Sequence, residues 1–218
     1  MSYLQEVYPL LQSAFWLTLK LSFWGILNAF ILGMVMSIVI FYRIPLFSQL
    51  FNGFVAFFRN TPLLLHLFFL YFGFPRAFGI VMSFEKTALI GLSLLGSAYM
   101  AEAFKSGINH IASSQLDAGK AIGLNPLQLA RYIIIPQAFT YSIPALGANC
   151  IFLFKETSVF TAIAGTDITT VVINLISNNG HTNENLLFLV IAYAVVIIPF
   201  TILLTFIEKR ARHAEFGA

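Results

Sequence analysis

The sequence predicts an all-α integral membrane protein with five membrane-spanning helices. Hydrophobic residues make up 59% of the 218 residues and charged residues only 10%, whereas soluble domains carry about 25% charged residues. So few charges cannot cover the surface of a soluble globule, and a disordered chain needs the opposite composition. Long runs without a charged residue are the second observation. The unequal distribution of basic residues between the loops is the third.

Three of the spans follow from runs without Asp, Glu, Lys or Arg, since crossing a bilayer takes roughly 20 apolar residues. They are Leu21–Tyr42, Tyr132–Phe154 and Asn185–Ile207. Two shorter runs, Asn60–Pro75 and Thr87–Ala101, become long enough if each extends past a flanking charge that can snorkel. The predicted single domain, residues 1–218, therefore has spans at about residues 13–42, 54–74, 86–106, 132–155 and 185–207.

The segments outside these spans predict no further domain. The apolar stretches Ile44–Phe58 and Val159–Leu175 contain Pro, Gly, Asn or Thr, and we interpret them as interfacial segments. The N-terminal residues have no basic region and include Glu6. We therefore expect no cleaved signal peptide and a first span that stays in the mature protein.

The basic residues predict how the chain is oriented. An odd number of spans puts the two termini on opposite sides of the membrane, and most basic residues fall on one side of the five-span arrangement. The positive-inside rule assigns that side to the cytoplasm, so we expect the N-terminus outside and the C-terminus inside. The residues that decide this are Arg43, Arg59, Lys105, Lys120, Arg131, Lys209, Arg210 and Arg212.

The longest predicted cytoplasmic segment, residues 107–131, is too short to fold alone. One of two adjacent serines can cap a short helix, Asp117 complements the dipole in its first turn, and Gly123 suits its end. Asn125-Pro126 then predicts the start of a second short helix. The residues alone leave open whether this helix–turn–helix segment lies along the membrane or docks on a partner.

This segment resembles the EAA loop of ABC-importer permeases. The EAA pattern is Glu-Ala-Ala, three residues, Gly, nine residues, and Ile-x-Leu-Pro. Asp117-Ala118-Gly119, Gly123 and Ile133–Pro136 occupy those places with matching spacing. Asp for Glu, Gly for the second Ala and Ile for Leu are departures, and Gly119 weakens a helix by up to ~1 kcal/mol relative to Ala.

Three further segments resemble motifs of the histidine/glutamine/arginine-type permeases, in the same order. Phe58–Phe69 is similar to Phe-Arg-Gly-Thr-Pro-Leu-Leu-x-Gln-Leu, with Asn60 and His66 as departures. Tyr99–Ile108 is similar to Tyr-x-Ala-Glu-x-x-Arg-Gly-Gly-Ile, and Lys155–Val159 to Lys-Asp-Thr-Ser-Leu. The resemblance implies the five-span type I importer permease fold and a transport subunit for polar amino acids in the bacterial inner membrane.

The same resemblance implies the partners. They are a second permease, identical or homologous, two cytoplasmic ATPases that bind ATP and magnesium, and an extracytoplasmic substrate-binding protein. This chain has no Gly-rich phosphate loop, so we expect it to bind no ATP or other cofactor itself. It has no zinc-ligand pair and no nucleophile–base spacing, so we expect no enzyme activity. Membrane lipid is an expected partner and nucleic acid is not.

Charged and hydroxyl residues in or near the spans are candidates for a substrate path. Lys155 and Glu156 follow a charge-free run, and a charge inside the membrane costs at least ~2.5 kcal/mol unless it faces a cavity or a partner. An amino acid could use both charges. The alternatives are a position in the headgroup layer, or pairing with each other or with the second permease. The full candidate set is Lys155, Glu156, Thr157, Ser158, Thr61 and Glu102.

For several of these residues a structural role is the simpler interpretation. Glu102 and Lys105 are spaced as an ordinary helical ion pair. Thr61-Pro62 predicts the start or a reshaping of the second span, and His66 among Leu and Phe is more often a packing residue than a ligand. For the loop, the resemblance implies that ATPase coupling rests on Asp117, Ala118, Gly119, Gly123 and Leu124.

Two other functions compete with an ATP-driven importer. A secondary transporter driven by an ion gradient usually shows internal repeats and paired broken helices, and we find no repeat in the five predicted spans. A membrane scaffold without transport activity would not need the small-residue loop or the charges at Lys155 and Glu156.

Overall fold

The structure is all-helical and elongated. This computed structural model describes residues 3–216, so residues 1–2 and 217–218 of the predicted domain lie outside it. The described part contains helices and turns but no strand. Four helical segments are long and apolar enough to cross a bilayer, and a bent pair of helices makes up to five. The predicted all-α membrane fold is therefore confirmed, with one span differing in shape.

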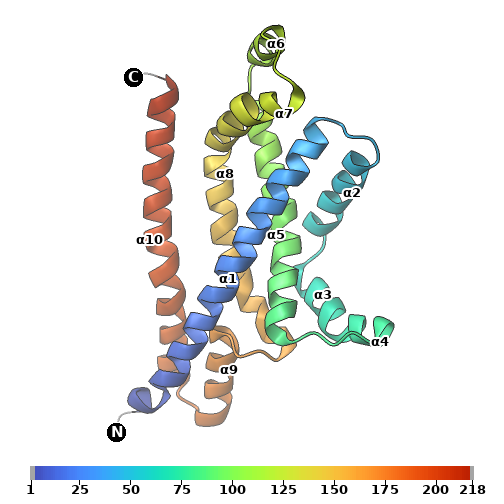
Figure 1. Cartoon of the computed structure of the whole chain (residues 1–218). Coiled ribbons are helices and arrows are strands. Elements are labelled where there is room, and N and C mark those ends of the chain that lie inside the picture. Colours follow the sequence, from blue (N-terminus) through green and yellow to red (C-terminus); the bar gives the residue numbers. More distant parts are fainter. Residues whose placement is uncertain (1–2, 217–218) are drawn as a thin grey trace.

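Figure 1 shows the long helices running along one axis, with the N-terminal end of the described chain at the bottom and its C-terminal end at the top. In chain order the helices are α1 (Tyr3–Phe41), α2 (Phe47–Arg59), α3 (Leu63–Phe68), η1 (Phe69–Gly73), α4 (Phe74–Phe78), α5 (Phe84–Asn109), α6 (Ser113–Ala121), α7 (Pro126–Leu129), η2 (Ala130–Ile134), α8 (Ile135–Glu156), η3 (Thr157–Ile163), α9 (Ile168–Asn179) and α10 (Thr182–Phe216).

The first helix begins at Tyr3 rather than near residue 13 as predicted. The additional turns are stabilised by tertiary packing, because Val7 and Leu11 are buried in a cluster with Ile168 and Val172 of α9. Hydropathy alone could not indicate this extension, since it depends on a helix more than 150 residues further along the chain.

The second span, predicted over residues 54–74, is not one continuous helix. Helix α2 ends at Arg59, and the helical segment that starts at Leu63 is bent from it by 105°. Pro62 is extended, with φ −64° and ψ 145°; it lacks an N–H group and disfavours helical geometry at Thr61. The predicted interfacial segment 44–58 also differs, because α2 packs against α1 and α5 and buries Val55.

The helices of the remaining spans extend beyond the predicted span bounds. Helix α5 begins after Ser83, whose hydroxyl accepts the Lys86 N–H, and α10 begins at Thr182 rather than near 185. The fourth span, predicted over 132–155, is one continuous helical segment from Pro126 to Ile163. The stretch predicted as interfacial, 159–175, forms part of η3 and most of α9.

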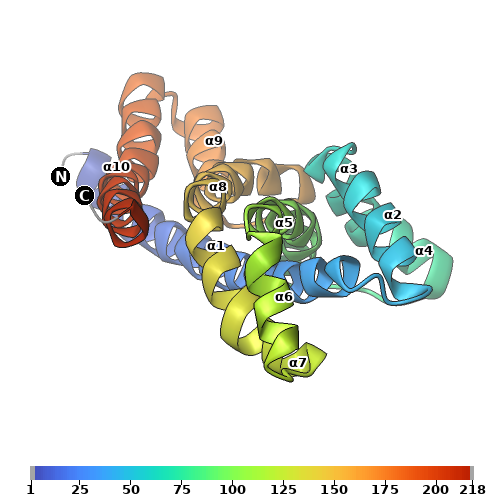
Figure 2. The ribbon, with the colours of Figure 1, turned by 90° about the horizontal axis from the view of Figure 1, so that it is seen from above.

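Helix α5 is the centre of the packing, and α1, α2 and α8 all contact it (Figure 2). Small residues make this close contact possible, as is usual between membrane helices. At Gly33 of α1, an added Cβ atom would lie 2.5 Å from the Met100 Cβ of α5. At Gly107 of α5, it would overlap the Ser142 hydroxyl and the Ala138 carbonyl oxygen of α8.

Asp167 ties α9 to the rest of the fold. It is fully buried, and its carboxylate accepts the backbone N–H groups of Thr169 at 3.1 Å and Thr170 at 3.3 Å. The backbone N–H group of Ile168, the residue that directly follows Asp167, donates a hydrogen bond to the Thr18 hydroxyl oxygen of α1 at 3.0 Å. Burial raises the pKa of the Asp167 carboxyl, and the hydrogen bonds that it accepts oppose the rise.

Candidate functional site

The loop between α5 and α8 has the tight turn that the sequence predicts. Gly123 has φ +84°, and its N–H donates to the Lys120 carbonyl at 2.9 Å while the Leu124 N–H donates to the Gly119 carbonyl at 3.1 Å. These two bonds form a Schellman motif, in which a left-handed residue follows the end of a helix. The predicted serine cap is wrong, because Ala112 precedes α6 and no side chain caps it.

The second helix of the loop begins where it is predicted to begin. Asn125 accepts the Gln128 N–H at 2.9 Å, and the Gln128 side chain accepts the Asn125 N–H at 2.9 Å, which is a capping box. This helix is not a separate short element, because α7 continues through the π-helical turn η2 into α8. The wider turn directly precedes Pro136, which has no N–H to offer a regular helix.

The five residues predicted to couple to an ATPase divide between two faces of the loop. Asp117, Ala118 and Gly123 are exposed. Gly119 is buried instead, since an added Cβ atom would lie 2.6 Å from side-chain carbons of Ile133 and Leu129. Leu124 also packs toward the chain's own core.

Sequence reasoning missed two residues at the outer edge of this loop. Ile122 and Leu127 are 77% and 79% exposed, among the most exposed large apolar side chains that the structure describes. They lie on either side of the turn at Gly123, and this position next to the predicted turn was the available signal. Two apolar side chains projecting from a turn are well suited to bury themselves in a protein partner.

One hydrogen bond connects the loop to the first span. The Tyr42 hydroxyl, just beyond the end of α1, donates to the Pro126 carbonyl at 2.7 Å. Burial raises the pKa of this hydroxyl above its usual value, so it remains a donor at neutral pH. A displacement of the loop is therefore linked directly to the end of α1.

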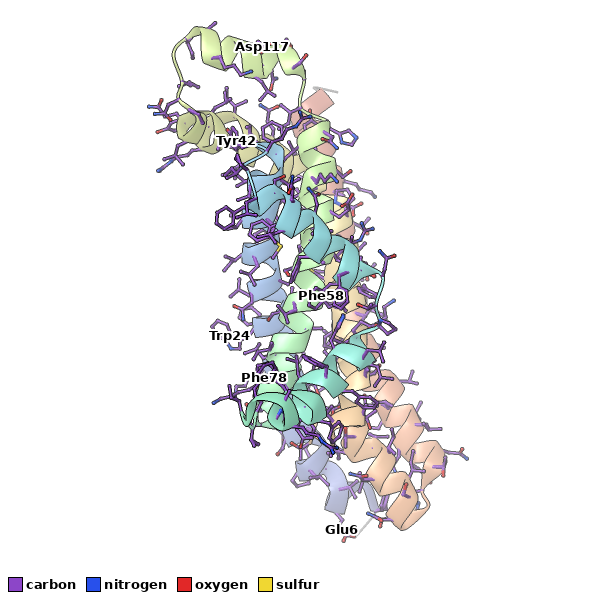
Figure 3. The ribbon with its side chains drawn as sticks, turned by 90° about the vertical axis from the view of Figure 1, so that its right-hand side faces the viewer. Glu6, Trp24, Tyr42, Phe58, Phe78 and Asp117 are labelled. Atoms are coloured by element: carbon purple, nitrogen blue, oxygen red, sulfur yellow. The ribbon has the colours of Figure 1, made fainter. Side chains whose placement is uncertain are left out.

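Glu102 forms a charged cluster between two helices rather than an ordinary pair within α5. Its Oε2 lies 3.4 Å from the Arg59 Nη1 at the end of α2 and 3.8 Å from the Lys105 Nζ. The Arg59 guanidinium carbon also lies 5.6 Å from the centre of the Tyr99 ring. The sequence places Arg59 among the basic residues of the cytoplasmic side; in the structure it lies at the bend of the second span, one residue after Phe58 (Figure 3).

Thr61 and His66 stabilise the bend itself. The Thr61 hydroxyl donates to the Phe57 carbonyl at 2.8 Å and lies 2.6 Å from the His66 Nε2. Because Thr61 has only one proton to donate, we assign the hydrogen of the neutral imidazole to Nε2. His66 is buried and packs on the Phe58 ring with centroids 4.5 Å apart, which is the packing role expected of it.

The candidates at the end of α8 differ in accessibility. Lys155 is exposed and Glu156 is half-buried, and among the residues that the structure describes neither forms a salt bridge. Thr157 is fully buried, donates to the Phe154 carbonyl at 2.7 Å, and lies 3.2 Å from the Tyr193 hydroxyl.

The structure brings some of the candidate residues together and leaves others apart. Ser158 is half-buried in η3, and η3 packs against α3, the helix that follows Thr61. Glu102 belongs instead to the groove between α2 and α5. Among the side chains that the structure describes, those of residues 3 and 5–210, no cluster of three or more His, Cys, Asp or Glu could hold a metal ion.

Comparison with known proteins assigns this architecture. The family described as "Binding-protein-dependent transport system inner membrane component" matches residues 29–213. "Probable amino-acid permease protein YxeN" of Bacillus subtilis is 33% identical over 206 residues, which cover 94% of this chain and 92% of that protein. "Probable glutamine ABC transporter permease protein GlnM" of the same organism is 31% identical over 212 residues, which cover 96% of both chains.

Solved structures agree with this assignment. The crystal structure of an amino acid ABC transporter with histidines matches with a TM-score of 0.84 and 28% identity, covering 96% of this chain and 99% of the other. A structure of the MetNI methionine ABC transporter has a TM-score of 0.76 at 18% identity, covers 95% and 99% of the two chains, and shows the same fold. Family membership implies ATPase partners, a substrate-binding protein and a multi-pass position in the bacterial inner membrane. The chain belongs to the inner membrane components of binding-protein-dependent transport systems, and it is a transport subunit of an ABC transporter rather than an enzyme.

Proposed function

We propose that this chain is the permease of an importer for polar amino acids, a single domain of residues 1–218 with its N-terminus outside and its C-terminus in the cytoplasm. The names of its relatives, which include amino-acid and glutamine permeases, support the substrate class. The observation that carries the coupling role is the α6–α7 turn, which projects at the same end of the molecule as the C-terminal end of α10 (Figure 1). The positive-inside rule supports a cytoplasmic position for that end.

The α6–α7 turn is the surface that we assign to the ATPase. The exposed residues Asp117, Ala118 and Gly123, together with Ile122 and Leu127, form the contact surface. Gly119 and Leu124 act from behind it, because they hold α6 against the start of the fourth span. A rigid helix–turn–helix element can transmit an ATPase movement to α8, with which it is continuous, and to α1 through Tyr42.

The transport cycle that we propose uses this arrangement. Two such permeases, identical or homologous, enclose the path, and two ATPases hold the ATP and magnesium ions. A loaded binding protein docks on the outer face, and closure of the ATPases draws the α6–α7 turns together and opens the path outward. ATP binding works by stabilising one of two conformations of the spans. The residues proposed for the path are Lys155, Glu156, Thr157, Ser158, Thr61 and Glu102, of which Thr157 acts through packing.

Uptake by the reconstituted complex tests the proposal. The permease, its ATPases and its binding protein are placed in proteoliposomes with ATP inside, and radioactive L-glutamine is supplied outside. We expect uptake that needs internal ATP and survives an ionophore that collapses ion gradients. Uptake that is driven by an ion gradient without ATP would indicate a secondary transporter. A chain that copurifies with no ATPase and supports no uptake would indicate a scaffold.

Two substitutions test the path residues in the same assay. Lys155→Met and Glu156→Gln should each reduce uptake while the complex still assembles, because a charge facing the path would be lost. Lys86→Met, which removes an exposed lysine at the start of α5, is the matched control. Uptake equal to that of the control would restrict Lys155 and Glu156 to a structural role.

A further inference from the structure

A groove with charged and amide side chains in its walls runs along α2, from the connection between α1 and α2 to the side of α2 that faces α5. Two adjoining cavities of about 430 and 400 Å³ form it, and they share Asn52 and Lys105 in their walls. The first extends to Arg43 beyond the end of α1, and the second extends to Arg59 at the bend of the second span. We call this the α2–α5 groove, and Figure 3 looks onto this side of the molecule, with Phe58 marking α2.

The charges of the α2–α5 groove do not balance. Arg43, Arg59 and Lys105 are cationic, and Glu102 is the one carboxylate among the residues that line the two cavities. Glu102 is shared by two cations at 3.4 and 3.8 Å, so it neutralises one charge and leaves two. The Arg59, Glu102 and Lys105 side chains are each about 40% exposed, and a cleft with an excess of one charge attracts solutes of the opposite sign.

The contents of the groove match an α-amino acid. A guanidinium group binds a carboxylate through two parallel hydrogen bonds. Arg59 presents such a group at the end of the groove that lies at the bend of the second span. Glu102 and the face of Tyr99, both beside Arg59, suit an ammonium ion. A bound zwitterion would replace the Arg59–Glu102 contact with one partner for each charge, so neither residue would be left unpaired.

The remainder of the groove would then meet the side chain of the substrate. The Asn52 amide of α2, Lys105 of α5 and Arg43 in the connection between α1 and α2 line the rest of the groove. These three groups can bind a carboxylate or an amide of the substrate, and the positive charges of Lys105 and Arg43 repel a cationic side chain. We propose that the α2–α5 groove binds the amino acid substrate by its α-carboxylate at Arg59 and its ammonium at Glu102, and that it selects acidic and amide side chains over cationic ones. This inference rests on the proposed function and specifies the class of amino acid carried.

Direct binding to the complex tests the inference, because the binding protein would otherwise determine selectivity. The permease with its ATPases is placed in phosphatidylcholine nanodiscs without the binding protein, and binding of L-glutamine, L-glutamate and L-arginine is measured by scintillation proximity. We expect L-arginine to bind at least about tenfold more weakly than the other two, since one unfavourable charge contact is worth a factor of this size.

Variants separate recognition from folding. Arg59→Gln should weaken L-glutamine binding by about tenfold or more, and Arg59→Lys should restore only part of it, because lysine lacks the planar fork. Lys105→Gln should weaken L-glutamate binding more than L-glutamine binding, a difference between the two ligands that a purely structural role would not produce. Lys20→Gln removes an exposed cation paired with Glu85 outside the groove and should change neither affinity.

Three results would overturn the inference. The first is L-arginine binding as tightly as L-glutamine, and the second is unchanged binding in Arg59→Gln. The third is loss of L-glutamate binding when phosphatidylglycerol is added to the nanodiscs, which would indicate an anionic lipid headgroup in the groove. If any of these occurs while proteoliposomes still take up amino acid with ATP, the groove assignment fails alone; if uptake is also absent, the proposed function fails.

Discussion

Substituting the glycine at the α6–α7 turn should uncouple the permease from its ATPase. Gly123 has φ +84°, and an added Cβ atom would meet nothing within 4 Å. A Gly123→Val change therefore introduces no clash inside the chain, and its cost is the strain of a β-branched residue in left-handed backbone. That strain is on the order of 1–3 kcal/mol. Since 1.4 kcal/mol is a factor of about ten, the ratio of native to non-native turn would fall by a factor of about 5 to 150.

The expected phenotype is a permease that inserts into the membrane but binds its ATPase poorly. The spans lie outside this turn, so their packing should be unaffected. The measurements are the amount of ATPase that copurifies in mild detergent and the ATP hydrolysis stimulated by the loaded binding protein. We expect both to fall by about tenfold, in line with the strain.

Gly180→Val is the matched control for this experiment. Gly180 follows α9 with φ +78° and also has nothing within 4 Å of an added Cβ atom, so the substitution carries the same strain. It lies at the end of the molecule opposite the α6–α7 turn (Figure 1). ATPase binding and hydrolysis that are equal in Gly123→Val and Gly180→Val would refute a coupling role for the turn.

Three further substitutions test the contacts that hold the fold together. Gly107→Ala should destabilise the permease by about 1–3 kcal/mol or more, because the methyl group overlaps the backbone of α8; Gly53→Ala, which meets nothing within 4 Å, should not lower the unfolding temperature in detergent. Thr61→Val should cost about 1–3 kcal/mol by removing two hydrogen bonds at the bend and leaving the His66 donor unpaired, and a wild-type unfolding temperature would contradict that role. For Asp167, the raised pKa means that the folded chain holds the proton more tightly than the unfolded chain, so the free energy of unfolding should fall as the pH rises from the ordinary value, about 3.9, through the raised one. Asp167→Asn keeps a capping side chain and should abolish the loss of thermal stability that follows when the pH is raised above about 4; an unchanged loss would show that other titrating groups cause it.

Local chemistry explains why parts of the loop were predictable. Gly123 ends α6 and Asn125-Pro126 begins the next helix because a positive φ, a capping side chain and a missing N–H group act within a few residues. The same holds for the break at Thr61-Pro62. The predicted serine cap was wrong because a helix can begin without a capping hydroxyl, and α6 begins after Ala112 with no side-chain cap.

Composition and local signals by themselves determined that the chain is a membrane protein of about five spans, where its sharp turn lies, and that Thr61-Pro62 starts or reshapes the second span. Only the tertiary structure decided the 105° bend at that break, the burial of Gly119, and the meeting of Arg59 with Glu102 across α2 and α5. Hydrophobicity, caps and proline geometry are properties of neighbouring residues, so a sequence displays them directly. Which face of a helix is buried, and which charges meet, depends on elements far apart in the chain that become neighbours only when the helices pack.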